Sequence, residues 1–268
     1  MTKTKLRIIS LLSILLAISL AVVSYCGVFI SKTYERDAPS MAAQGIGQDF
    51  VDLFLVVPML IVSLIFVLKK SKTASFIFSG LLFYIVYSFI IYCFGVHFNY
   101  LFLLYCATLG LSFYIFIIMV YEFNRMDVQD WFGGTAPARL VGTYLIIVSL
   151  IFYLLWLKEI IPAILKDAVP ASVGDYNLLT NPVHVIDLAF ALPGLIITSV
   201  LLYRRHRLGF IFAPVALVFI IVLAIALAAM VMVLKMKGFS DDSSVAVIFI
   251  VLAALSLVFL FFFLKSRV

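Results

Sequence analysis

The chain has 268 residues, of which 66% are hydrophobic and only 12% are charged. Soluble domains are close to half apolar and about a quarter charged, so this composition excludes an ordinary water-soluble domain and predicts a chain surrounded mainly by lipid. The formal charge of +6 does not indicate nucleic-acid binding, because the basic residues lie between apolar segments, where membrane topology accounts for them.

Long apolar segments follow one another along the whole chain, and each can cross a bilayer as a helix of about 20 residues. We therefore predict an all-α, polytopic transmembrane helical bundle of about eight spans. The first apolar run continues beyond the length of a signal peptide, so we expect it to remain as the first span. The predicted spans cover residues 7–30, 49–68, 74–95, 99–121, 140–161, 183–203, 208–234 and 245–264.

Basic residues are unevenly distributed over the predicted connections. If both termini are cytoplasmic, the inner segments hold 13 of the 19 Lys and Arg residues, whereas most of the 13 acidic residues fall on the outer side. This bias follows the positive-inside rule and predicts cytoplasmic N- and C-termini. The compact loops favour a multi-pass protein of a prokaryotic plasma membrane.

Two stretches that lie 135 residues apart share a pattern. "DLFLVVP" (52–58) and "DLAFALP" (187–193) align at the Asp-Leu pair and at the proline, and basic clusters at 69–72 and 204–207 end both spans. The pattern predicts a 4+4 tandem repeat with a first four-helix half (1–122), a cytoplasmic linker (123–139) and a second four-helix half (140–268). The alternative is that a short motif has arisen twice by chance, since the other spans align poorly.

The aspartates of these two stretches are the main candidates for function. Asp49 and His184 are predicted to lie in the first turn of a helix, where capping explains them, but Asp187 lies too far from the predicted N-cap Asn181. A carboxylate near the centre of a span costs about 2.5–3.5 kcal/mol. Asp52 and Asp187 therefore predict an outward-facing polar site, and the alternative is a hydrogen-bond network that joins the halves.

Other polar residues can contribute to the same site. His97 falls at an outer turn and, with His184, Asp52 and Asp187, would form a plausible divalent-metal site, although histidines at an interface also serve as simple hydrogen-bonding residues. Tyr84 and Tyr87 lie three residues apart and can face one pocket, with aromatic packing as the alternative. The candidate ligand-binding residues are Asp52, Asp187, His184, Asp49, His97, Tyr84 and Tyr87.

The absence of several known motifs excludes some classes of function but does not identify the function. The sequence has no phosphate-binding glycine loop, no GxSxG and no HExxH, and it indicates no cofactor and no oligomeric state. We expect a protein that binds or transports a small molecule or cation through an outward-facing polar cavity, with proton coupling as a natural mechanism. The alternatives are a membrane-embedded enzyme that acts on a lipid or isoprenoid head group at the outer leaflet, and an accessory subunit.

Overall fold

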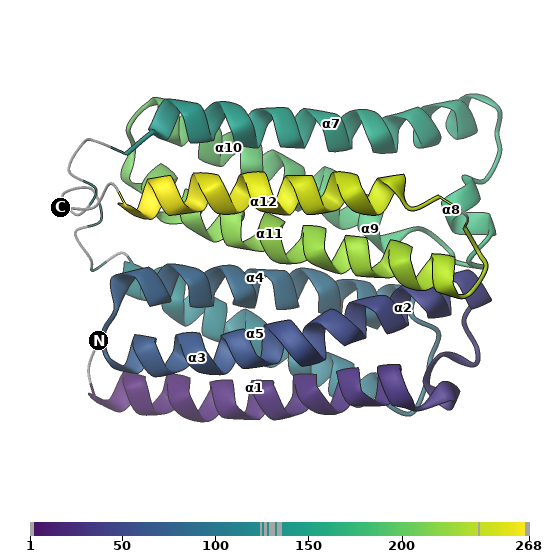
Figure 1. The fold of residues 1–268 in the computed structure, drawn as a ribbon, viewed down its shortest axis with the longest axis horizontal. Coiled ribbons are helices and arrows are strands. Elements are labelled where there is room, and N and C mark those ends of the chain that lie inside the picture. The colour runs from purple at the N-terminus through teal and green to yellow at the C-terminus, as the bar shows by residue number, and fades with distance from the viewer. Residues whose placement is uncertain are drawn as a thin grey trace.

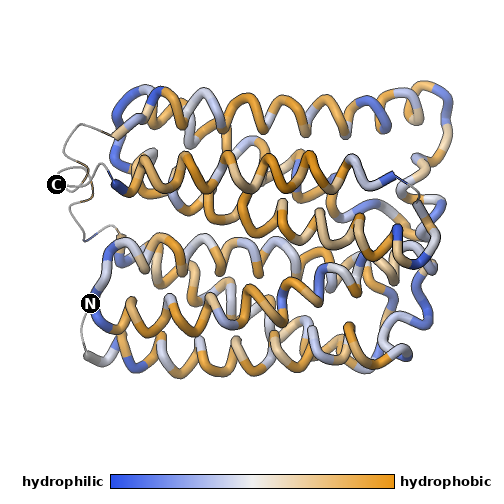
Figure 2. The backbone as a smooth tube through the Cα atoms, in the orientation of Figure 1, coloured by the Kyte–Doolittle hydropathy of each residue, from blue (hydrophilic) through white to orange (hydrophobic). Residues whose placement is uncertain are grey.

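A computed structural model describes residues 3–123, 125, 128, 132, 136–240 and 242–265. Within this part of the chain, eight helical spans run along the long axis of one bundle, and each is long and apolar enough to cross a membrane (Figure 1). Apolar residues line the length of the bundle, and polar residues gather at its ends (Figure 2). The prediction of an all-α, eight-span bundle is confirmed, and the chain is an integral membrane protein. Most of the predicted linker 123–139 lies outside the described residues.

Each half of the chain contains four spans, the second of which is interrupted. The first half consists of α1 (Lys3–Phe29), η1 (Ser31–Tyr34), α2 (Pro39–Val51), η2 (Asp52–Val56), α3 (Val57–Leu68), α4 (Lys72–Gly95) and α5 (Phe102–Phe123). The second half consists of α7 (Ala138–Leu165), α8 (Ala171–Gly174), α9 (Pro182–Ile186), η3 (Asp187–Ala191), α10 (Leu192–Tyr203), α11 (Arg207–Met236) and α12 (Ser244–Lys265). Helix α1 begins and α12 ends at the same end of the bundle, and we call the opposite end the distal end (Figure 1).

The second span is longer than its predicted range of 49–68. Helix α2 begins at Pro39, which occupies its first turn, so most of the segment expected to be a polar loop is helical. The extra turns pack against α11 through Gly47, where an added Cβ would lie 2.7 Å from the Cα of Met230. Asp49 therefore lies well inside α2, and capping of the first turn does not account for it.

The two interrupted spans have the same local geometry. Each contains a five-residue π-helical turn that begins at the carboxylate, Asp52 in η2 and Asp187 in η3. The carbonyl of Asp52 accepts a hydrogen bond from the N–H of Val57, and η3 repeats this bond. Pro58 and Pro193 follow as the second residues of α3 and α10. Proline lacks an N–H and cannot continue a regular ladder, so the wide turn precedes each proline.

Other element boundaries also repeat at the 135-residue offset. Helices α3 and α10 both contain 12 residues, and α4 and α11 begin at equivalent positions. Each short connection contains a residue with positive φ, Lys70 at 63° and Arg205 at 52°. The boundaries of these elements agree at this offset, and the tandem repeat itself stays a prediction. The halves differ at the distal end, where α2 begins well before the position equivalent to the start of α9.

The two halves meet along α4 and α11. Helix α11 contacts α2 and α4, and α9 contacts α4, so the third span of each half touches the second span of the other. The approach is close at Gly80 of α4, where an added Cβ would lie 2.4 Å from the Cβ of Val218 and 2.9 Å from the carbonyl oxygen of Val215. Small residues permit such close contact between helices in a membrane.

Candidate functional site

Asp52 lies at the start of η2 and is only 1% exposed. Its Oδ1 accepts a hydrogen bond from the Tyr84 hydroxyl of α4 over 2.8 Å. Its Oδ2 is buried without a hydrogen-bond partner among the described residues, although Gln48 lies one turn earlier on the same helix. A carboxylate oxygen in this position carries unused acceptor capacity inside a span.

Asp187 lies at the equivalent position of the second half and has a partner on each oxygen. The Tyr87 hydroxyl donates to Oδ1 over 2.9 Å, and the indole Nε1 of Trp156 donates to Oδ2 over 2.7 Å. Trp156 belongs to α7, whereas Tyr87 belongs to α4 of the first half. Tyr84 and Tyr87 therefore do not serve one carboxylate: they bind the equivalent carboxylates of the two halves. The Tyr87–Asp187 hydrogen bond joins the two halves, as expected from the alternative that the aspartates belong to a hydrogen-bond network between them.

Asp49 is fully buried one turn before Asp52. It accepts hydrogen bonds from the hydroxyls of Tyr34 and Tyr92, the latter over 3.0 Å. Gly27 of α1 provides the space, because an added Cβ there would lie 1.6 Å from Asp49 Oδ2. Tyr34 lies in η1, outside the spans, and burial together with the neighbouring Asp49 carboxylate raises its pKa well above the usual range. The phenol of Tyr34 therefore stays protonated and acts as the donor.

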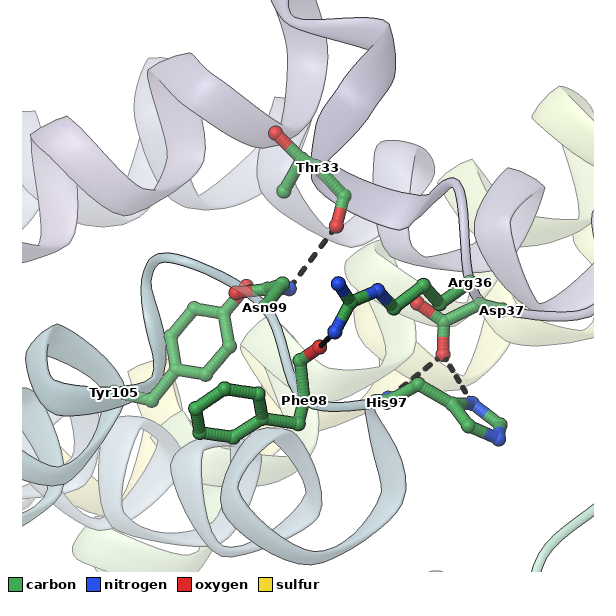
Figure 3. Close-up of polar contacts among 7 residues, drawn as sticks. All are labelled: Thr33, Arg36, Asp37, His97, Phe98, Asn99 and Tyr105. Carbon is green, nitrogen blue, oxygen red and sulfur yellow. Dashed lines mark hydrogen bonds and ion pairs between the residues drawn. The ribbon is translucent and has the colours of Figure 1, made fainter.

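His97 takes part in a polar network that fastens the α1–α2 connection to the α4–α5 connection (Figure 3). Asp37 Oδ1 accepts from both the backbone N–H and the Nδ1 of His97, each over 2.9 Å. The side-chain amide of Asn99 donates to the carbonyl of Thr33 over 3.0 Å. Asp37 is 8% exposed, and its Oδ2 has no hydrogen-bond partner among the described residues.

His184 is buried in α9, and its Nε2 has no hydrogen-bond partner among the described residues. Its Nε2 lies 3.7 Å from Oε2 of Glu159, and its ring centroid lies 4.7 Å from that of Trp156. Trp156 thus contacts both His184 and Asp187.

The residues considered for a metal site do not come together. His97 pairs with Asp37, His184 lies near Glu159, and Tyr84 binds Asp52. Across the described ranges, no three His, Cys, Asp or Glu side chains gather closely enough to hold a metal ion. The geometry therefore gives no support to the metal site that the sequence suggested as an option.

A cavity of about 270 Å³ lies between the halves near the distal end. Its wall contains aromatic side chains that bind the buried carboxylates: Tyr34 and Tyr92 bind Asp49, and Tyr87 and Trp156 bind Asp187. The carboxylates of Asp49 and Asp187 thus lie one hydrogen bond behind the cavity wall. The polar residues of the wall that are not aromatic are Asp37, Gln44, Gln48, Ser172 and Asn181.

The wall of this cavity has a clear electrostatic character. Among the described residues that line it, none is Lys, Arg or His, whereas Asp37 is a carboxylate. Gln44 of α2 donates a hydrogen bond to the Tyr176 hydroxyl over 2.8 Å, which ties the segment between α8 and α9 to the first half. The acidic character of the cavity thus comes from Asp37, whose Oδ1 also bonds the His97 ring. The cavity is lined by several aromatic residues and bounded by residues of both halves.

Several residues of the site were not found from the sequence. Tyr34 and Asp37 lie between the predicted spans 7–30 and 49–68, and no spacing in the sequence linked them to Asp49. Trp156 could have been predicted as a site residue, because an indole N–H inside an apolar span needs a buried hydrogen-bond acceptor. Comparison with protein-family models, with curated proteins and with solved structures gave no match to this chain.

Proposed function

We propose that this membrane protein binds a small molecule or cation in the cavity between its halves and transports it across the bilayer. The proposal rests on one observation: the cavity wall is hydrogen-bonded directly to two buried carboxylates, Asp49 and Asp187, that come from different halves. A ligand that displaces or reorients Tyr87 or Tyr92 would act on these carboxylates through a single hydrogen bond.

The negative character of the site favours a cation or a neutral ligand over an anion. Asp37 lies in the cavity wall, and none of the described wall residues is basic. Ionisable residues inside membrane spans mark ion pathways and proton relays in pumps and transporters. We therefore include proton exchange at Asp52 and Asp187 in the proposal, because a carboxylate can release its proton when a cation arrives.

The π-helical turns provide a place where the interrupted spans can change shape. Each turn begins at a carboxylate and ends just before a proline. Such turns occur frequently at functional sites and are local departures from the regular helix. Protonation of Asp52 or Asp187 would therefore act at the irregular turn of each span. The enzymatic alternative has less support, since His97 and His184 lie beside their own acidic partners, Asp37 and Glu159.

Solute-induced currents in reconstituted liposomes test the proposal. The solutes are alkali and alkaline-earth cations, amino acids, polyamines and small quaternary ammonium ions, each applied with and without a pH gradient. We expect at least one solute to produce a current that the pH gradient changes. Asp52→Asn and Asp187→Asn should abolish this current, because they keep the size and the acceptor oxygen of the side chain but cannot exchange a proton.

Asp175→Asn and Asp242→Asn are matched controls, because both aspartates are exposed in connections at the distal end. Both controls should keep the wild-type current. Exchange of one proton for one monovalent cation carries no current, so the internal pH of the liposomes is recorded as well. A panel that produces neither a current nor a pH change above that of empty liposomes would refute the proposal, as would full activity in both the Asp52 and the Asp187 variant.

A further inference from the structure

A second hollow lies next to the central cavity and opens toward lipid. This groove of about 520 Å³ is lined mainly by apolar residues from the end of α4, residues 177–180, and α9 with η3. Phe94 and Phe190, which belong to membrane spans, are 75% and 71% exposed at the groove. Apolar side chains exposed within spans face the hydrocarbon of the bilayer.

The groove and the central cavity share part of their walls. Val96, Leu178 and Pro182 line both of them. At this place α4 and α9 approach closely, because an added Cβ on Gly95 would lie 2.9 Å from Cγ of Pro182. The lipid-facing groove and the cavity are therefore neighbours across these side chains.

The two hollows differ in chemistry in the way that the two ends of an amphipathic ligand differ. The cavity is lined by Tyr34, Tyr87, Tyr92 and Trp156 together with Asp37. The Oδ1 of Asp37 bonds the His97 ring, and its Oδ2 is buried without a hydrogen-bond partner among the described residues. Aromatic residues and a carboxylate form the usual cage for a quaternary ammonium group. The groove offers mainly apolar walls, which suit an alkyl chain.

We propose that the ligand of this protein is an amphipathic cation that enters sideways from the bilayer. Its cationic head occupies the central cavity, and its alkyl tail lies in the groove. The tail stays in apolar surroundings throughout, so entry by this route does not require its transfer into water. This inference rests on the proposed function and specifies the class of ligand.

The fluorescence of Trp156 provides a direct binding assay, since its indole is part of the cavity wall. The chain has two tryptophans, so Trp131→Phe leaves Trp156 as the single reporter. The protein in lipid nanodiscs is titrated with octyltrimethylammonium, tetramethylammonium and octyl sulfate, with empty nanodiscs as blanks. Each methylene that leaves water strengthens binding about fourfold, so we expect octyltrimethylammonium to bind at least roughly tenfold more tightly than tetramethylammonium. Octyl sulfate should give no saturable change.

Two sets of variants test the binding site of the cationic head and that of the alkyl tail separately. Asp37→Asn should weaken the binding of both ammonium ions, whereas Asp175→Asn, an exposed site outside the cavity, should not. Removal of the groove walls by Phe94→Ala with Phe190→Ala should weaken octyltrimethylammonium only. The matched control is Phe66→Ala with Phe262→Ala, which removes two exposed aromatic rings away from the groove.

A photoreactive octyltrimethylammonium with a diazirine on the tail tests the location in the unmodified protein. Labelled peptides should contain residues 90–97 or 177–190, and even labelling over all lipid-facing helices would overturn the inference. Saturable binding of octyl sulfate, or no binding of either ammonium ion, would overturn the ligand class. Equal affinities for the two ammonium ions would overturn the placement of the tail in the groove, while the carboxylate-dependent currents would still support transport.

Discussion

The phenolic oxygen of Tyr87 lies 2.9 Å from Oδ1 of Asp187, although the two residues are 100 positions apart and belong to different halves. One turn earlier on the same helix, Tyr84 binds Asp52 of its own half. At the equivalent positions of α11 the chain has Phe219 and Val222, which carry no hydroxyl. Helix α4 therefore supplies the phenol donors for the carboxylates of both halves.

Removal of the Tyr87 hydroxyl should weaken the contact between the halves. Tyr87→Phe leaves Oδ1 of Asp187 buried without its donor, which costs about 1–3 kcal/mol of the free energy of unfolding. Thermal unfolding in detergent measures the loss, and Tyr114→Phe serves as the control because Tyr114 is largely exposed. Equal stability of both variants would show that the hydrogen bond contributes nothing to folding.

Gly27 should be essential for the position of Asp49. A methyl group from Gly27→Ala would lie 1.6 Å from Asp49 Oδ2, so the carboxylate must move and lose its bonds to Tyr34 and Tyr92. We expect destabilisation by about 2 kcal/mol or more. Gly110→Ala should be neutral or slightly stabilising, since nothing lies within 4 Å of its added Cβ and alanine favours a helix. If steric overlap with Asp49 is the cause, Asp49→Ala in the same chain should recover part of the loss.

The packing of the halves should depend on Gly80. A protease site in the linker 123–139 allows the folded chain to be cut in the membrane, and the two halves should then purify together. Gly80→Leu should separate them, because even the first added carbon would lie 2.4 Å from Val218 Cβ. Gly194→Leu is the control, since the space around its added Cβ is open. Association of the Gly80→Leu halves would contradict the role assigned to this contact.

Cysteine labelling should reveal the orientation and the access to the cavity. The background chain has its three natural cysteines, Cys26, Cys93 and Cys106, replaced by alanine. In intact cells a membrane-impermeant thiol reagent should label Gln44→Cys in the cavity wall and leave His206→Cys, in the predicted cytoplasmic connection, unlabelled.

Labelling of His206→Cys in those cells would reverse the predicted orientation. If Gln44→Cys stays unlabelled while Ser240→Cys reacts in an exposed segment between α11 and α12, the cavity is closed to the outer solution.

The spans and the repeated motif could be predicted because they depend on local properties. The length of the apolar segments identified eight spans. Asn181 followed by Pro182 correctly marked the start of α9. As expected of an N-cap residue, the Oδ1 of Asn181 accepts a hydrogen bond from the N–H of Val183 over 2.9 Å. The start of α2 was wrong by about three turns, since the helical turns that begin at Pro39 are held by their packing against α11. Local composition alone made that stretch resemble a loop.

The sequence by itself determined that the chain is embedded in a membrane and how many times it crosses the bilayer. It also showed that Asp52 and Asp187 occupy equivalent positions inside spans. Hydrophobicity and spacing carry this information, because each residue contributes to it independently of its distant neighbours. Only the tertiary structure decided the partner of each carboxylate, the separation of His97 and His184 from any common site, and the cavity between the halves. Those features depend on contacts between helices that are far apart in the chain. The periodicity of residues along a single helix does not show which other helix it contacts.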